Sequence, residues 1–368
     1  MIVFTQFHNK PLLFQKPLFL ITTYEPGRLK DCFARMELAL KNNYYLAGFL
    51  SYEAGYAWEK SLTYERKYDF PLCYMGVYES CEHALPWPKA SLVENHLKHP
   101  RLNISQERYF SDIGLIRDHI ARGDVYQITY CLKLLFDFAG SPWRLYNSLL
   151  KRQPVPYPAY IETSDFSILS LSPEKFLNKD CDHIVTKPMK GTWPRGDTFV
   201  DDLIQRLKFG RDKKNRAENV MIADLLRNDL GRVGFNVRAP RLFEIAGYRT
   251  LFQMTSTVSA SLPEEIPLEE IFGALFPSGS VTGAPKIRAM QVIKTLEQED
   301  RRIYTGVIGY ITPGRKMFFN IPIRTLLLRA GRGEMGIGGG IVWDSTPQGE
   351  WDEGLLKARF VTELSTHQ

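Results

Sequence analysis

One stretch of this sequence changes its hydrophobic period in mid-course, and that change limits the folds open to the chain. Ile113, Ile116 and Ile120 recur at helical spacing, and Gly123 follows as a C-terminal cap. Over 126–138, apolar residues instead alternate with polar ones, which is the pattern of a half-buried strand. The sequence therefore predicts a helix, a glycine turn and a long strand with one face exposed to water.

The polar side of that strand carries Gln127, Thr129, Lys133 and Asp137. The rest of the second half mixes helices and strands without a regular strand–helix–strand repeat. Apolar spacing predicts helices over about 217–230 and 268–275 and from about 286, and strands over about 307–311 and 317–328. This mixture favours an α+β fold built on antiparallel sheet over a doubly wound parallel fold.

Composition narrows the class of protein but not its activity. With 44% hydrophobic and 24% charged residues, the 368-residue chain has the make-up of a globular protein rather than a disordered one. The net charge of +6 comes without a basic block or an aromatic-basic motif. A small anionic substrate suits this charge, and nucleic-acid binding is not indicated. The five cysteines form no C-x-x-C pair, which argues against a zinc knuckle or a disulfide framework.

Domain organisation and location follow from segments that interrupt the apolar pattern. Residues 80–103 are rich in proline and polar residues and predict a linker. We expect an N-terminal region, 1–100, that is integral to the same fold as a catalytic region, 104–365. No run is apolar enough to cross a bilayer and the N-terminus lacks a secretory signal, so the expected location is cytoplasmic, with no membrane partner.

Two neighbouring segments place a lysine on an irregular backbone. SPEKF occupies 172–176, and TKPMKGTWPRG occupies 186–196 with two prolines. Such rigid loops position reactive groups more often than helices do, so Lys190 is a candidate reactive residue. A surface lysine in an ordinary turn has the same local sequence, and this segment alone leaves both interpretations open.

Acidic residues recur in two later segments. Within 217–234, Glu218 lies in a helical apolar pattern, as on the exposed face of any amphipathic helix. Within 336–353, Glu350 and Glu353 are three residues apart and share a face if that part is helical. Oxygen ligands without cysteine or histidine would favour magnesium over zinc.

Glycine-rich stretches are candidates for close approach to a ligand. In GSVTGAPK, over 279–286, Thr282 is expected to cap a helix whose first turn takes Pro285. The free N–H groups of such a helix would suit a carboxylate or phosphate, although a purely structural cap fits equally well. Three consecutive glycines at 338–340 would let the backbone approach a ligand closely.

Eight segments occur in a characteristic order: DVYQITYCLKL, LSPEKF, TKPMKGTWPRG, ENVMIADLLRNDLGRV, FPSGSVTGAPKIRAM, YTGVIGY, FNIPIRTLLL and GGGIVWDS. In this order they resemble the chorismate-utilising enzymes, a family that includes anthranilate, aminodeoxychorismate and isochorismate synthases. The resemblance runs from about residue 104 to 361. It implies a single large α+β unit of two antiparallel sheets packed face to face, with helices outside.

The resemblance also implies roles for individual residues. Glu218 and Glu353 would be magnesium ligands with Glu350 beside them, and the ion would grip the ring carboxylate of chorismate and polarise the departing hydroxyl. Arg324 and Tyr304 would contact the enolpyruvyl carboxylate, since an arginine fork matches a planar carboxylate. The other implied substrate contacts are Gly191, Thr192, Thr282, Gly283, Gly338, Gly340 and Lys357.

Two positions point to one branch of the family. Gln127 stands where isochorismate synthases carry a lysine that activates water, so hydration is disfavoured. Lys190 lies in PMKGT, which is similar to the PIKGT of aminodeoxychorismate synthases rather than the PIAGT of anthranilate synthases. In that branch the lysine looks like a covalent nucleophile. Lys190 would attack carbon 2 as the hydroxyl leaves carbon 4, with Glu174 as the acid, and ammonia would then add at carbon 4.

The implied activity is amination of chorismate to aminodeoxychorismate with the pyruvyl group retained, a transferase step towards p-aminobenzoate and folate. Gln253 replaces a histidine implicated in pyruvate loss, which fits retention, whereas Trp193 departs from the usual arginine of GTRPRG. No glutaminase motif is recognisable, so ammonia is expected from a separate glutamine amidotransferase subunit in a transient heterodimer. The alternatives are anthranilate synthase component I, isochorismate or salicylate synthase, and a catalytically silent chorismate-binding subunit.

Overall fold

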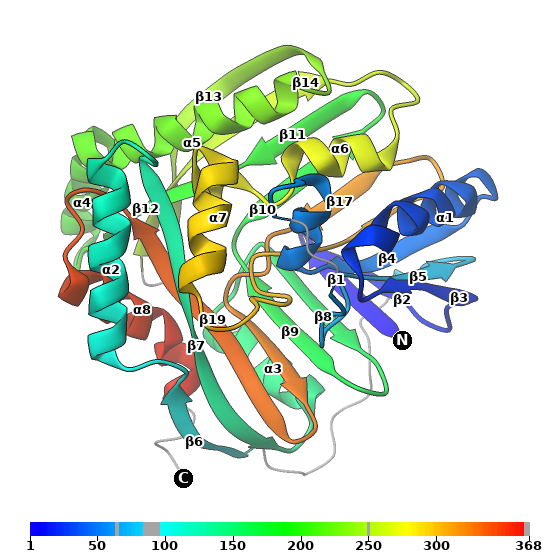
Figure 1. Ribbon diagram of the computed structural model, residues 1–368, viewed down its shortest axis with the longest axis horizontal. Helices are drawn as coiled ribbons and strands as arrows, with labels where there is room; N and C mark the ends of the chain where they lie inside the picture. The colour runs from blue at the N-terminus through cyan, green and yellow to red at the C-terminus, as the bar shows by residue number, and fades with distance from the viewer. Residues whose placement is uncertain (63–65, 84–95, 249–250, 364–368) are drawn as a thin grey trace.

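Two antiparallel sheets pack against each other in the computed structural model, which describes residues 1–62, 66–83, 96–248 and 251–363, and helices cover their outer faces (Figure 1). Within this part of the chain the first sheet has nine strands, in the spatial order β15 (Gly283–Ala284), β7 (Gln127–Ala139), β19 (Arg332–Ile341), β18 (Thr325–Arg329), β9 (Ser167–Ser172), β8 (Tyr157–Glu162), β1 (Ile2–Phe7) and β2 (Lys10–Phe14), with β6 (His96–Leu102) paired to β7.

The second sheet has ten strands in the same described residues. Their order is β12 (Met189–Pro194), β14 (Leu251–Ser261), β11 (His183–Lys187), β10 (Lys175–Asp180), β17 (Met317–Asn320), β16 (Val307–Ile311), β4 (Tyr45–Leu50), β5 (Cys73–Tyr78) and β3 (Phe19–Thr23), with β13 (Phe235–Gly247) paired to β14. The α-helices are α1 (Leu29–Lys41), α2 (Gln106–Ala121), α3 (Pro142–Arg152), α4 (Phe199–Arg211), α5 (Lys213–Gly231), α6 (Leu268–Leu275), α7 (Lys286–Leu296) and α8 (Pro347–Thr362), and the 3₁₀ turns are η1 (Pro26–Arg28), η2 (Tyr52–Trp58) and η3 (Gly279–Val281).

Buried aromatic and aliphatic side chains of both sheets meet in shared clusters. Phe7 of β1 lies against Phe318 of β17, with ring centroids 4.6 Å apart, and Tyr157 of β8 packs on the same Phe318 ring at 5.7 Å. The N-terminal strands join both layers, because β1 pairs with β8 in the first sheet and β4 pairs with β16 in the second. The α+β architecture predicted from the sequence is confirmed.

The helix, glycine turn and long strand predicted over 113–138 are confirmed. Helix α2 begins after Ser105, whose hydroxyl accepts the N–H of Arg108, and Gly123 follows the helix with a φ of +75°. Strand β7 then runs from Gln127 to Ala139. This strand lies at the centre of the site described below.

The prediction that β7 has a water-exposed face is wrong. Gln127, Thr129 and Lys133 are buried, and Tyr126, expected inside, is 66% exposed. The polar face looks onto other protein groups: the carbonyl of Thr129 accepts a hydrogen bond from Arg301, and Lys133 pairs with Glu334 at 3.0 Å. Alternation identifies the strand, but it cannot tell a face turned to water from one turned to a buried polar site.

Two boundary predictions also need correction. The strand expected over 317–328 is two strands. Strand β17 ends at Asn320, Arg324 adopts a φ of +51°, and β18 begins at Thr325. The linker expected over 80–103 contains strand β6, which pairs with β7, while its part at 84–95 lies outside the described residues. Helices α5, α6 and α7 and strand β16 were predicted correctly. No helix within the described ranges has the length and apolar character needed to span a bilayer.

Glu53 of the N-terminal region forms hydrogen bonds with the segment that precedes β16. This carboxyl is 2% exposed, and its oxygens accept the backbone N–H groups of Arg301 (2.6 Å) and Arg302 (3.1 Å). Burial, aided by the charge of Asp300, raises the pKa of Glu53 to about 8. The folded chain therefore keeps this proton over a pH range in which an unfolded chain has released it.

That difference predicts a pH-dependent stability. Between the ordinary glutamate pKa and about 8, the folded state binds more protons, so the contribution of Glu53 to stability falls as pH rises through this window. Replacing Glu53 with glutamine removes the titration, and the melting temperature of wild type should fall by about 2 °C or more relative to the variant between pH 5 and pH 8. Glu79→Gln, at an exposed position, is the control. Parallel pH profiles for wild type and Glu53→Gln would contradict the prediction.

Candidate active site

Lys190 projects from an irregular part of β12, at the edge of the second sheet. The pairing of β12 with β14 shifts register between Met189 and Thr192, and Gly191 within this bulge has a φ of +94°. A methyl group on Gly191 would lie 2.7 Å from the amide oxygen of Asn215, so glycine is required there on both counts. The bulge turns the lysine side chain towards β19 of the first sheet.

The amine of Lys190 lies over a glycine of β19. A methyl group placed on Gly340 would be 2.3 Å from Nζ of Lys190 and 2.4 Å from Nε2 of Gln127. Burial lowers the pKa of Lys190, Lys357 lowers it further, and the carboxylates of Glu218, Glu353 and Glu350 oppose the shift. The amide of Gln127 is fully buried, and neither of its polar atoms has a partner in the described structure. The amine of Lys190 and the unpaired amide of Gln127 thus lie side by side over Gly340.

Glu174 is a buried acid next to this lysine. The carboxyl is 3% exposed, and its Oε1 accepts the hydroxyl of Ser280 at 2.7 Å and the N–H of Met189 at 3.4 Å. Burial raises its pKa to about 7, and Ser280, Met189 and the charge of Lys190 hold the value down. Glu174 therefore carries a proton in an appreciable fraction of molecules at neutral pH, which suits a general acid.

Two residues expected to bind a carboxylate lie in the same region. Arg324 is half-buried, burial lowers its pKa, and among the described residues no carboxylate forms an ion pair with its guanidinium. Tyr304 is 8% exposed, and its ring packs so closely on β19 that a methyl group on Gly336 would lie 2.2 Å from it. Gly336, Gly338 and Gly340 share one face of β19, because alternate residues of a strand point the same way. An uncompensated buried guanidinium favours an anionic ligand.

The acidic residues of α8 face the other side of β19. A methyl group on Gly339 would lie 2.9 Å from Oε2 of Glu350 and 3.7 Å from Oε1 of Glu353. Lys357 donates to Glu353 and to the carbonyl of Gly338, both at 2.7 Å. Burial and the charge of Glu353 raise the pKa of Glu350 against the hydrogen bond from Ser345, whereas Lys357 outweighs burial and lowers the pKa of Glu353.

The candidate residues thus come together around one end of β19, and the described part of the chain matches one family model almost throughout. The model, described as chorismate binding enzyme, matches residues 6–363. The chain belongs to the chorismate binding enzymes.

Curated relatives within this family include aminodeoxychorismate synthases and an anthranilate synthase. The chain is 37% identical over 261 residues to aminodeoxychorismate synthase component 1 of Escherichia coli, covering 70% of this chain and 58% of that protein. It is 36% identical over 268 residues to anthranilate synthase component 1 of Aquifex aeolicus, covering 72% of this chain and 54% of that protein. The matched part thus spans little more than half the length of these relatives.

Solved structures show the same fold. Anthranilate synthase component I from Streptococcus pneumoniae superposes with a TM-score of 0.84 at 24% identity, covering 95% of this chain and 91% of that chain. The menaquinone-specific isochorismate synthase MenF of Escherichia coli gives a TM-score of 0.80 at 16% identity, covering 99% and 88%. These likenesses confirm the fold of two antiparallel sheets that was expected of a chorismate binding enzyme.

The glycine-rich segment of 279–286 differs from its prediction. Thr282 does not cap α7: its hydroxyl bonds the carbonyl of Ser278 at 2.9 Å, and the helix begins after Pro285. Residues 283 and 284 instead form the short strand β15 against β7, so the local rule for helix capping gave way to sheet pairing. A methyl group on Gly283 would lie 2.2 Å from the carbonyl oxygen of Gln127, which explains the glycine.

Other predicted and unpredicted residues complete the description. Thr192 is exposed on β12 opposite Gln253 of β14. Trp193 turns away to stack on Phe209 of α4 at 5.6 Å. Sequence reasoning missed Asn219, a buried amide of α5 that donates to the carbonyl oxygens of Lys190 (3.4 Å) and Met254 (3.3 Å). Its position in the sequence, directly after the candidate ligand Glu218, is the signal that could have identified it.

The donor chemistry at this end of β19 fits magnesium. Glu350 and Glu353 both approach Gly339, and carboxylate oxygens are the ligands that magnesium prefers, although Lys357 already pairs with Glu353. As the side chains stand in the described ranges, no three acidic, histidine or cysteine groups lie close enough to hold one ion. Loading would therefore require the carboxylates to reorient.

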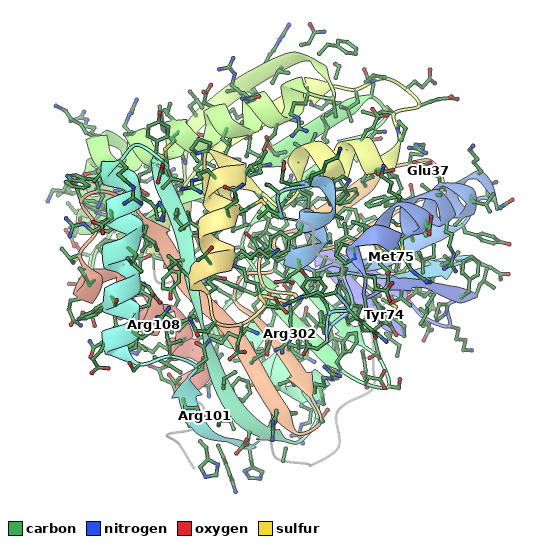
Figure 2. All side chains as sticks on the ribbon, in the orientation of Figure 1. Glu37, Tyr74, Met75, Arg101, Arg108 and Arg302 are labelled. Carbon is green, nitrogen blue, oxygen red and sulfur yellow. The ribbon has the colours of Figure 1, made fainter. Side chains whose placement is uncertain are left out.

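A separate cavity of about 520 Å³ contains none of the predicted site residues. It lies at the opposite end of β7 and β19, near Arg101 and Arg302 (Figure 2). Arg302 is already paired with Asp69 at 2.8 Å and with Glu334. This cavity therefore does not identify the residues that gather around Lys190.

Proposed function

We propose that this chain aminates chorismate at carbon 4 to give aminodeoxychorismate, with the enolpyruvyl group retained. The observation that carries the proposal is the pairing of a lysine whose pKa is lowered by burial with the buried acid Glu174, whose pKa is raised to about 7. A nucleophile must be neutral and its acid protonated, and the directions of the two pKa shifts favour these protonation states. The names of the curated relatives agree with this activity.

In the first step of the proposed mechanism, Nζ of Lys190 forms a bond to carbon 2 of the ring as the bond from carbon 4 to its hydroxyl breaks. Glu174 gives its proton to the hydroxyl, which leaves as water, and both conjugated ring double bonds shift by one position towards carbon 4. The new ammonium group on Lys190 then loses a proton, which Glu174 takes back. Gln127, buried and unpaired beside the amine, is oriented to hydrogen-bond the ring substituents as this bond forms.

In the second step, ammonia forms a bond to carbon 4 while the bond from carbon 2 to Lys190 breaks. The lysine departs as the amine after taking a proton, and the amine of the product loses one. Arg324 and Tyr304 are proposed to hold the enolpyruvyl carboxylate throughout. Magnesium at Glu218 and Glu353, beside Glu350, would neutralise the ring carboxylate and polarise the departing hydroxyl when bound.

Ammonia is proposed to come from a glutamine amidotransferase subunit. The printed name of several relatives, component 1, implies a second component in those systems. We likewise propose a cytoplasmic location and a place on the route to p-aminobenzoate and folate.

Product analysis tests the activity. With chorismate, magnesium and ammonium, the purified chain should yield a product that becomes p-aminobenzoate only when aminodeoxychorismate lyase is added. Chromatography distinguishes that product from anthranilate, which the Aquifex relative makes the main alternative. Direct formation of anthranilate would show that pyruvate is lost and would overturn the proposal.

A further inference from the structure

Helix α4 turns a strip of large apolar side chains to the surface. Leu203 and Leu207 are 52% and 54% exposed, and Phe199, at the start of the helix, is 87% exposed. These three residues are four apart and therefore lie along one face, with Val200 and Ile204 beside them. We call these five residues the α4 strip. Soluble monomers rarely expose contiguous apolar surface of this kind unless it binds something.

The opposite face of α4 is fixed to the strand that carries Lys190. Trp193 of β12 donates its indole N–H to Gln205 at 3.0 Å and stacks on Phe209. Arg195, just after β12, makes two hydrogen bonds to the carboxylate of Asp202, at 2.5 and 2.7 Å. The exposure of the α4 strip is therefore a property of a well-anchored helix, and whatever covers the strip stands next to the strand of the proposed catalytic lysine.

The charged residues near the α4 strip indicate which kind of partner surface would fit it. Lys208 and Arg211 at the end of α4, and Lys213, Lys214 and Arg216 at the start of α5, are exposed, and Asp212 between them is the helix cap of α5. An apolar centre with basic residues at the C-terminal end of α4 matches a partner surface with an apolar centre and acidic residues opposite that end.

We infer that the α4 strip is the docking surface for the glutamine amidotransferase subunit. This inference rests on the proposed function, which needs ammonia at Lys190 while the chain carries no recognisable glutaminase motif. A subunit seated on α4 delivers ammonia beside β12, where the second step consumes it. A second copy of this chain on the same strip is the competing occupant, and the test separates the two.

The test compares two ammonia sources. Leu203→Glu/Leu207→Glu places two charges in the middle of the strip without touching Gln205 or Phe209. With the purified amidotransferase subunit of the same organism, glutamine-dependent turnover should fall at least tenfold, and binding measured by calorimetry should weaken similarly, because central apolar contacts dominate such interfaces. Ammonium-dependent turnover should stay within twofold of wild type. Leu38→Glu/Leu115→Glu, at exposed leucines of α1 and α2, is the matched control and should retain both activities.

Three other outcomes overturn the inference. Unchanged binding and glutamine-dependent turnover would place the partner elsewhere, and loss of both ammonia sources would mean that α4 acts only through β12. A homodimer of wild type that the variant abolishes in sedimentation, with partner binding unaffected, would assign the strip to a second copy. Failure of wild type to use ammonium refutes the proposed function instead, and calorimetry then still decides whether the amidotransferase binds α4.

Discussion

Replacing Lys190 with alanine is expected to lower ammonium-dependent turnover of chorismate by about 10²-fold or more, since removal of a covalent nucleophile typically costs at least this much. The physical basis is the position of the amine over Gly340 and the lowering of its pKa by burial, which favours the neutral, nucleophilic form. Chorismate should still bind, since Arg324 and Tyr304 remain. Steady-state kinetics and a fluorescence titration with chorismate separate the two effects.

The matched control is Lys187→Ala, three residues earlier, which removes a lysine paired with Glu244 at 3.2 Å on the same sheet. That variant should keep wild-type turnover. Mass spectrometry of the intact chain during turnover should reveal an adduct in wild type that Lys190→Ala lacks. Undiminished turnover of Lys190→Ala would remove the lysine from the chemistry and leave direct addition of ammonia as the mechanism.

The elements around this lysine could be foreseen to very different degrees. Local periodicity was enough for α2 and β7, because Ile113 and its helical neighbours, and the alternation after Gly123, are signals contained in a few residues. The neighbours of β7 were not foreseeable in that way. Its pairing with β19, in which Gly340 lies opposite Thr129, joins residues about two hundred positions apart. Only the resemblance to a family, not periodicity, linked these segments in advance.

The wrong predictions also arose where contacts between distant segments decide the structure. Thr282 has the local sequence of a helix cap, but the residues that follow it form strand β15 and pair with β7. Gln127 was assigned to a water-exposed face because its neighbours alternate, although it is fully buried beside Lys190. In both cases tertiary contacts that no local window contains decided the outcome. Polar residues that break the expected burial pattern are here the ones that form the candidate site.

A single methyl group on β19 should separate the chemistry of this site from the stability of the fold. In Gly340→Ala the new Cβ would lie 2.3 Å from Nζ of Lys190 and 2.4 Å from Nε2 of Gln127. Both are ends of flexible side chains, so they can move aside and the fold should survive. Displacing the nucleophile by about 1 Å should nevertheless lower kcat by about 10²-fold. Steady-state kinetics and a thermal melt report on the two properties independently.

Two other glycines provide the contrast. In Gly338→Ala the new Cβ would lie 2.1 Å from the backbone carbonyl oxygen of Tyr130, which β-sheet pairing holds in place, so this variant should lose stability. Gly354→Ala, in α8, meets nothing within 4 Å and should leave both properties unchanged. Wild-type kcat in Gly340→Ala would mean that the position of Lys190 over this glycine is not needed for turnover. A large drop in its melting temperature would mean that the side chains around Gly340 are held as firmly as the backbone, and that the space above it is part of the packed core.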